Sequence, residues 1–378
     1  MVSPIAITKK KEINLSYIQV PIPDEPRKSN SACKTFPRAF FTFVCALITY
    51  VFLFTVLVAF FYALTFVFQY YQYQNMFEES IIKYNKTYST QKEYYYRFRI
   101  FYSNVKQFEA EEKKNQGLDL DVNEFTDRTD EELRRMIVEE RNIHKDPNAV
   151  RFEGSYLESG VTRPAEMDWR SQGKLTPVKN QGQCGSCWAF ATVAAVEAQH
   201  AIQKGSLVTL SEQEMVDCDS RNNGCSGGYR PYAMRFVKEN GLETEKSYPY
   251  SAKKHDQCLI GQNDTKIYID DYRMLSTNEE DVANWVGTKG PVTFGMKVTK
   301  TMYSYRSGIF NPSVEDCEEK SMGSHALTIV GYGGEGEAAY WIVKNSWGTS
   351  WGSDGYFRLA RGVNSCGMAN TVVAPIIN

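Results

Sequence analysis

Two cysteines separated by two residues begin the part of the sequence that could do chemistry, Gln181-Gly-Gln-Cys184-Gly-Ser-Cys187-Trp. This spacing fits half of a zinc site, a thioredoxin-like redox pair, or a nucleophile beside a structural cysteine. No second ligand pair at matching spacing follows, and we find no strand-helix-strand pattern around the pair. The third interpretation is therefore favoured.

Cys187 lies where Gly185 and Ser186 lead into a segment that is apolar nearly all round, as expected of a buried helix. The N-terminus of a helix carries partial positive charge and unpaired N–H groups, which favour the nucleophilic thiolate. Seven of the nine cysteines lie between residues 184 and 366. Because seven is odd, at least one of these thiols is unpaired or bonded to another chain.

A cysteine nucleophile needs a base, and the sequence holds four histidines. His325 directly precedes an apolar segment with a strand pattern, and a strand end beside a cleft suits a catalytic base. His200 ends the same predicted helix as Cys187, about 20 Å away by the helical rise. His144 falls in a predicted linker and His255 in a polar loop. A packed core histidine is the alternative for His325.

The motif Cys-Gly-Ser-Cys-Trp resembles the signature of papain- and cathepsin-type cysteine peptidases. In that family a histidine and an asparagine follow about 130–150 residues downstream. His325 falls inside this range, and Asn345, within Asn-Ser-Trp347-Gly, lies slightly beyond it. The resemblance implies that Cys187 attacks the scissile carbonyl and that His325 acts as acid and base. Asn345 would orient the imidazole. Trp347 would shield that hydrogen bond from water, and we also place it with the substrate-binding residues.

The resemblance also implies a substrate cleft. Gln181 and the backbone N–H of Cys187 would form an oxyanion hole. Gly227 and Gly228 would bind the substrate backbone, because only glycine allows so close an approach. Two residues depart from the family pattern. Ser324 replaces the usual Asp or Asn before the histidine, so we expect a shifted pH optimum. Arg230 lies near the pocket for P2, the second side chain before the cleaved bond. It could favour an acidic group or point to solvent, and we expect the latter.

By the same resemblance, six cysteines would form disulfides, which leaves Cys187 free: Cys184–Cys225, Cys218–Cys258 and Cys317–Cys366. No large insertion lies between Cys218 and Cys225, so an occluding loop of the cathepsin B kind is not expected. Endopeptidase action is therefore the default. Asn85-Lys-Thr and Asn263-Asp-Thr are glycosylation acceptors if this part is exported.

The region before the peptidase motif is charged and has a helical pattern. Five residues are spaced to share one helix face, and the first two are expected to pair: Glu93, Arg97, Phe101, Asn104 and Phe108. Thr129-Asp-Glu-Glu132 predicts a capping box that opens a short helix through Glu140. With Asn123-Glu-Phe-Thr-Asp127, this pattern resembles cathepsin L-like inhibitory propeptides. It implies an intramolecular inhibitor, removed by cleavage near residues 155–165.

Residues 39–68 contain no charge, and the segment is longer than the about 20 residues that span a bilayer. Lysines and arginines precede it, and no charge follows until Glu78. The positive-inside rule therefore predicts a single-pass type II precursor with a cytoplasmic N-terminus and an exported C-terminus. A cleaved signal sequence or a buried core helix are the alternatives.

We therefore predict a cytoplasmic tail (1–38), a transmembrane signal-anchor (39–68), a stalk (69–77), an inhibitory propeptide (78–160) and a peptidase domain (161–378). Helical patterns come early and strand patterns late in the last domain, which indicates an α+β fold. The resemblance implies two lobes, a helical left lobe and a β-barrel-like right lobe.

The predicted function is a cysteine endopeptidase acting on protein or peptide substrates, made as a membrane-anchored zymogen. The net charge of −2 suggests no nucleic-acid partner, and no cofactor motif is found. The family default is a monomeric mature enzyme, lysosomal, endosomal or secreted. The alternative is an inactive membrane-tethered binding protein on a peptidase scaffold, but the Cys, His and Asn are all present.

Overall fold

The computed structural model describes residues 38–115, 117–138, 162–261 and 265–378. The predicted cytoplasmic tail, Asn263 and the first part of the expected cleavage window lie outside these ranges. The chain divides into two compact units, residues 1–68 and 69–378.

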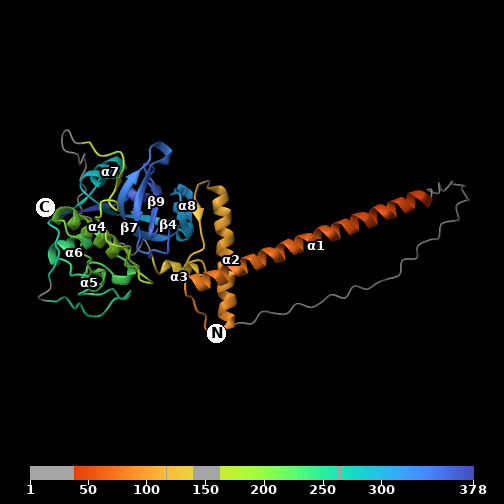
Figure 1. Cartoon of the computed structure of the whole chain (residues 1–378), viewed down its shortest axis with the longest axis horizontal. Helices are drawn as coiled ribbons and strands as arrows, with labels where there is room; N and C mark the ends of the chain where they lie inside the picture. The colour runs from red at the N-terminus through yellow and green to blue at the C-terminus, as the bar shows by residue number, and fades with distance from the viewer. Residues whose placement is uncertain (1–37, 116, 139–161, 262–264) are drawn as a thin grey trace, which may run out of the picture. The chain divides into compact units, whose positions relative to one another are not determined.

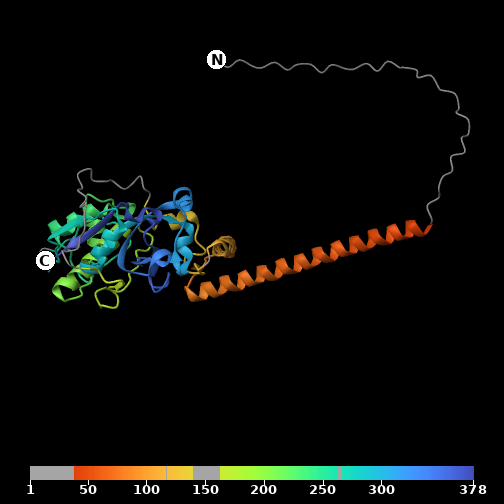
Figure 2. The same ribbon diagram turned by 90° about the horizontal axis from the view of Figure 1, so that it is seen from above.

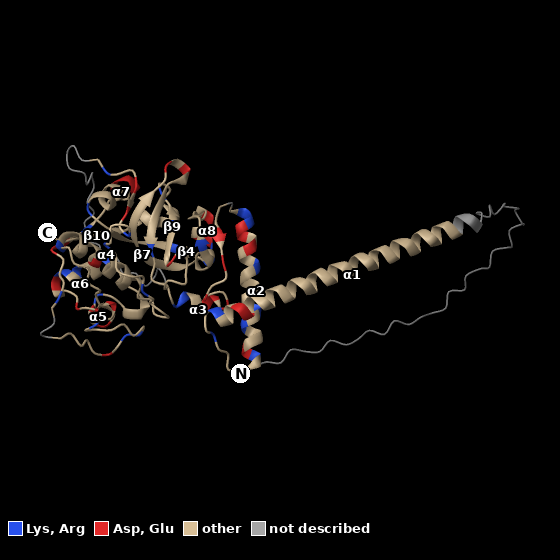
Figure 3. Ribbon diagram, viewed as in Figure 1, with Lys and Arg blue, Asp and Glu red and all other residues tan. Residues whose placement is uncertain are grey.

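Helix α1 (Arg38–Lys83) is one uninterrupted helix in both views (Figures 1 and 2). It is long and apolar enough to cross a membrane, and it is almost without charged residues before its C-terminal part (Figure 3). In such a helix every backbone group bonds within the segment, as a lipid surrounding requires. Residues 69–77, expected as a stalk, are helical and belong to α1.

The C-terminal part of α1 packs against helix α2 (Gln91–Lys114). The ring of Phe77 contacts those of Phe98 and Phe101, and the ring of Tyr73 contacts that of Tyr102. Thr90 caps α2 by accepting the backbone N–H of Glu93. The predicted face of α2 is buried at its apolar positions and at Asn104. The predicted Glu93–Arg97 pair is wrong, because Arg97 reaches across to Glu132 of another element, as described below.

Helix α3 (Asp130–Arg134) begins with the predicted capping box at Thr129. Its predicted extent through Glu140 is wrong, since the helix ends at Arg134. Val138 instead forms an isolated antiparallel bridge with Ser324, in which the backbone N–H of each residue donates to the carbonyl of the other. These bonds satisfy backbone groups that a longer helix would have paired internally.

The early part of the peptidase domain is helical (Figure 1). It consists of α4 (Cys187–Lys204), α5 (Glu212–Cys218) and α6 (Arg230–Asn240). In α4, 14 of the 18 residues are buried, so this helix forms the core of the helical part, as its apolar sequence predicts. Gly205, with φ of 74°, ends α4 in the left-handed conformation that favours glycine.

The later part is a mostly antiparallel sheet, in the order β3-β10-β4-β7-β8-β9-β6, with β2 added beside β7. Its strands are β2 (Met167–Asp168), β3 (Asp271–Met274), β4 (Val292–Thr299), β6 (Ile309–Phe310), β7 (Ser321–Gly333), β8 (Tyr340–Lys344), β9 (Tyr356–Ala360) and β10 (Val372–Ile376). Strand β7 contains the apolar segment after His325 for which the sequence predicts a strand. At Gly331 an added Cβ would lie 2.2 Å from the Met167 carbonyl oxygen, so glycine lets β2 approach.

The expectation of a β-barrel-like lobe is wrong, because the sheet does not close. Its edge strands, β3 and β6, do not pair with each other. A closed barrel needs continuous pairing around the ring with a fixed stagger. Strand β6 has only two residues and runs parallel to β9, so it offers too little edge for that closure.

Short elements complete the described chain: β1 (Asp119–Leu120), which pairs with β5 (Tyr305–Ser307), α7 (Glu279–Thr288), α8 (Val314–Glu319), and 3-10 turns at Gly224–Ser226, Lys300–Ser304, Gly336–Ala338 and Ser365–Asn370. Three disulfides join the pairs that the resemblance implies: Cys184–Cys225, Cys218–Cys258 and Cys317–Cys366. Among the described cysteines, Cys45 and Cys187 are free.

Candidate active site

The loop before α4 positions Cys187 as the first residue of that helix. The N–H of Gly185 donates to the Cys225 carbonyl at 2.9 Å, and a Cβ at Gly185 would lie 2.5 Å from the same oxygen. The loop is therefore held close to the disulfide-linked segment. On the other side, the Thr328 hydroxyl donates to the Ala191 carbonyl at 3.2 Å and joins β7 to α4.

Cys187 and His325 line one cavity of about 460 Å³ between α4 and β7. The Cys187 side chain is 1% exposed. Burial raises the pKa of this thiol to about 11, although the Ala326 backbone N–H acts in the opposite direction. In the state described, the thiol is therefore protonated at neutral and acidic pH.

His325 lies near the start of β7, and its Nε2 is 2.8 Å from Oδ1 of Asn345. That oxygen also accepts the N–H of Ser346 at 2.8 Å, which fixes the amide orientation. A bond to an acceptor places the proton on Nε2, and Nδ1, which is buried and has no partner, keeps its lone pair. Burial lowers the pKa of His325 to about 4, so the ring is neutral near pH 7.

Trp347 covers this pair. Its ring stacks on His325, with centroids 4.8 Å apart and an interplanar angle of 23°, and it stacks on Tyr303 on its other side. Trp347 is fully buried and does not line the cavity. The structure therefore places it behind the histidine rather than with the substrate-binding residues where the sequence analysis put it.

Gln181 is hydrogen-bonded through both ends of its side chain. Its Oε1 accepts the Ser346 hydroxyl at 2.6 Å, and its Nε2 donates to the carbonyl oxygens of Met136, at 2.7 Å, and Cys184, at 2.8 Å. Met136 belongs to the upstream region that resembles a propeptide. An upstream carbonyl thus accepts a hydrogen bond from the side chain predicted to bind an oxyanion.

The predicted glycines face two different neighbours. A Cβ at Gly227 would lie 2.3 Å from the Val138 side chain, so glycine admits the upstream segment there. At Gly228 a Cβ would lie 2.5 Å from the Trp188 ring, so this glycine allows close packing on α4. Of the two, Gly228 lines the cavity.

Residues 136–138 reach the cleft, and Val138 lines the cavity. Val138 and Ser324 exchange two backbone hydrogen bonds of 2.8 and 2.7 Å, which extend the edge of β7. The sequence analysis missed this segment. The run Met-Ile-Val after a charged helix was the available signal, since such a run is costly to leave exposed.

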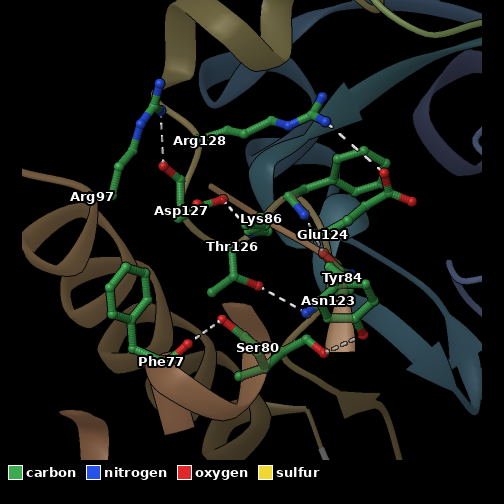
Figure 4. Close-up of polar contacts among 12 residues, drawn as sticks. Phe77, Ser80, Tyr84, Lys86, Arg97, Asn123, Glu124, Thr126, Asp127 and Arg128 are labelled. Atoms are coloured by element: carbon green, nitrogen blue, oxygen red, sulfur yellow. Dashed lines mark hydrogen bonds and ion pairs between the residues drawn. The ribbon is translucent and has the colours of Figure 1, made fainter. Parts of the chain in front are cut away.

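The upstream region is fixed by polar contacts of its own (Figure 4). Asp127 accepts hydrogen bonds from Lys86 and Tyr88, and Arg97 donates to the Asp127 carbonyl at 3.1 Å. Arg97 also forms a two-point ion pair with Glu132, at 2.6 and 2.7 Å. This pair joins α2 to α3, directly before the segment that enters the cleft.

Two further expectations meet the structure here. Arg230, expected to point to solvent, is only 6% exposed and lines the cavity, because the start of α6 faces β4 rather than the surface. Asn85, a predicted glycosylation acceptor, is exposed, and an acceptor must be exposed to receive a glycan. No group of three or more possible metal ligands occurs among the described residues.

Comparison with known proteins agrees with this geometry. Residues 163–376 match the papain family cysteine protease model, and residues 77–133 match the cathepsin propeptide inhibitor domain (I29). The chain therefore belongs to the papain family of cysteine proteases. It is a cysteine endopeptidase of the papain and cathepsin type, and it carries its propeptide.

Individual relatives support this assignment. A cathepsin L-like proteinase of Phaedon cochleariae is 39% identical over 300 residues, which cover 77% of this chain and 90% of the relative. Pro-cathepsin H of Bos taurus is 37% identical, over 79% of this chain and 89% of the relative. The solved procathepsin L2 from Tenebrio molitor larval midgut is 34% identical, with a TM-score of 0.73, and covers 81% of this chain and all of its own.

Proposed function

We propose that this protein is a membrane-anchored zymogen whose mature domain hydrolyses peptide bonds through a thioacyl intermediate on Cys187. The observation that carries the proposal is the bond from Gln181 Nε2 to the Met136 carbonyl oxygen, 2.7 Å long, beside the cavity that holds Cys187 and His325. A peptide carbonyl of the propeptide thus accepts the hydrogen bond that the carbonyl of a substrate would need from Gln181. The propeptide inhibits by occupying this cleft.

Removal of the propeptide exposes the catalytic pair to water. Exposure relieves the desolvation that raises the pKa of Cys187 and lowers that of His325, so the proton moves from sulfur to Nδ1 and an ion pair forms. Asn345 accepts from Nε2, so Nδ1 keeps the lone pair that takes this proton. Trp347, stacked on the imidazole, excludes water from that hydrogen bond.

The reaction then follows from these groups. The thiolate attacks the scissile carbonyl carbon, and the resulting oxyanion accepts hydrogen bonds from Gln181 Nε2 and the Cys187 N–H. The C–N bond breaks as Nδ1–H protonates the leaving amine, which leaves a thioester on Cys187. His325 next removes a proton from water, the hydroxide attacks the thioester, and the acid is released with the thiol restored.

The anchor and the orientation belong to the proposal as well. Helix α1 is suited to span a membrane, and the basic residues precede it. We place the N-terminus in the cytoplasm and the peptidase in a lumenal or extracellular space. The exposed Asn85 would then carry a glycan, and the mature enzyme, a monomer, would act in lysosomes or endosomes or after secretion. Cleavage near residues 155–165 would release it.

The test is to express the full chain in a secretory eukaryotic cell, acidify the product, and follow its mass and its hydrolysis of fluorogenic peptides. We expect loss of the propeptide and peptidase activity in the parent. Cys187→Ala should lose at least about 10³-fold in kcat, because no other group can form the thioester. Its circular dichroism should match that of the parent.

Two results would contradict the proposal. A Cys187→Ala variant that still cleaves peptides would show that the nucleophile is another residue. A parent that stays inert after an added protease has removed the propeptide would favour the inactive binding protein on a peptidase scaffold.

A further inference from the structure

An arginine without a counter-ion lines the cavity that holds Cys187 and His325. Arg230 is the first residue of α6, its side chain is 6% exposed, and it shares the wall of this cavity with Met296 and Thr371. It is thus close to the reacting groups, but no step of the proposed mechanism uses it.

The guanidinium group is incompletely hydrogen-bonded. Its Nη2 donates to the Thr371 carbonyl at 2.9 Å, while its Nε is buried and has no partner. Among the residues that the structure describes, no Asp or Glu forms an ion pair with Arg230. Burial lowers its pKa to about 10, so the group is still charged at neutral and acidic pH.

Two other largely buried cations of the same domain have carboxylate partners, whereas the buried Lys344 donates to Thr176. Lys179 contacts Glu197 at 3.0 Å and Glu212 at 2.7 Å, and Lys266 contacts Glu214 at 2.8 Å. A buried charge is normally paired in this way, because its desolvation is costly. Arg230 differs from both in having an open cavity where the carboxylate would be.

The surroundings are shaped to hold the guanidinium at this place. A Cβ at Gly295 of β4 would lie 2.7 Å from Nη1, so any larger residue would displace the group. The one acidic residue that lines the cavity, Glu318, is already paired with Lys297. The charged residues that line the cavity, Arg230, Lys297 and Glu318, therefore leave its wall with a net positive charge.

We propose that Arg230 is a specificity-determining residue that binds the carboxylate of an Asp or Glu side chain at P2 of the substrate. This inference rests on the proposed function, because it assigns a substrate side chain to the cavity beside Cys187. A carboxylate matches the planar fork of a guanidinium, and such charge-assisted bonds are stronger than neutral ones. It would also supply the buried Nε with the acceptor that it lacks.

The test uses enzyme matured from the full chain, with active sites counted by a thiol-directed covalent inhibitor. Two fluorogenic dipeptides identical except for Glu or Gln at P2 isolate the charge, and a third carries Leu at P2. The assays are run at about pH 6, where the Glu side chain of the peptide is ionised. We expect wild-type kcat/KM to be about tenfold higher for Glu than for Gln.

Substitutions then assign the preference to Arg230. Arg230→Met should remove the preference for Glu over Gln, because the apolar side chain has a similar volume but carries no charge. Arg230→Lys should retain part of the preference for Glu, since the positive charge remains but the two-point geometry of the guanidinium is lost.

Other results overturn the inference in distinguishable ways. Equal rates for Glu and Gln in the wild type would make Arg230 a structural residue, whether or not the variants fold. A wild-type preference that survives in Arg230→Met would assign it to another group. In both cases cleavage of the Leu peptide leaves the proposed function intact. If counted active sites cleave none of the three peptides, the proposed function fails, and this inference with it.

Discussion

The propeptide and the catalytic cleft both bury polar side chains, but they differ in how completely those side chains are hydrogen-bonded. In the propeptide, Asn104 donates to the Thr126 carbonyl, and Asn123 both donates to Tyr303 and accepts from Phe125. The carboxylate of Asp127 accepts from Lys86, which is labelled beside it in Figure 4, and from Tyr88. These bonds fix one arrangement of the inhibitory segment.

The cleft has the opposite character. His325 Nδ1, Asn345 Nδ2 and Trp347 Nε1 are all buried and lack partners. Unsatisfied groups are costly in a protein interior and cluster where function requires them. The propeptide thus uses polar groups to specify its own docking, whereas the catalytic site keeps His325 Nδ1 available for reaction. Substitutions that remove one group from each region test this difference.

Among these substitutions, the largest effect is expected at Gln181, where the two regions meet. Gln181→Ala removes the donor to the oxyanion, so kcat of the mature enzyme should fall by about 10²–10³-fold, with KM little changed. Steady-state kinetics on a fluorogenic peptide measures this. Gln203→Ala, the same change at an exposed position of α4, is the control and should keep full activity. A loss confined to KM would make Gln181 a binding residue only.

An intermediate effect is expected at the ion pair that joins α2 to α3. Glu132→Gln should speed acid processing of the full chain about tenfold near pH 6, because the charge-assisted bonds to Arg97 are weakened. Gel analysis of processing against time gives the rates. Glu93→Gln is the matched control, since the Glu93 carboxylate bonds to Ser89 and not to Arg97.

The pH dependence of this effect has a defined sign. The hydrogen bond between Glu132 and Arg97 lowers the pKa of the Glu132 carboxyl from its usual 4.5 to about 2. A carboxylate with a lowered pKa stabilises the folded state above its unfolded pKa and loses that contribution as the pH falls. Wild type and Glu132→Gln should therefore differ above about pH 4.5 and converge toward pH 2. A difference that grows on acidification would contradict this assignment.

The sequence predicted the local features of the molecule well. The buried helix that begins at Cys187, the strand after His325 and the capping box at Thr129 each depend on neighbouring residues, and the structure contains all three. The catalytic roles of Cys187, His325 and Asn345 stay predictions. These roles were assigned from a sequence motif. In the fold, Cys187 and His325 line one cavity, and His325 is hydrogen-bonded to Asn345.

Features that depend on distant contacts were not predictable in the same way. Arg97 has a carboxylate one helical turn away, but Glu132 offers two-point geometry from another element. Helix α3 stops early because Val138 pairs with Ser324, far along the chain. The burial of Arg230 depends on the absence of a side chain at Gly295. Periodicity within one segment contains no information on such partners.

The smallest effect is expected at Ser324, which lines the cavity beside His325 where the family usually has Asp or Asn. Ser324→Asp adds a negative charge near the imidazole, which favours the protonated ring and raises its pKa. The imidazolium–thiolate pair then persists to higher pH, so the alkaline limb of kcat/KM should move up by about half a unit to one unit. Ser321→Asp adds the same charge at the start of β7, outside the cavity, and should leave the profile unchanged. An equal shift in both variants would make the effect one of net charge. A shift in Ser324→Asp alone would show that the serine sets the working pH of this cleft.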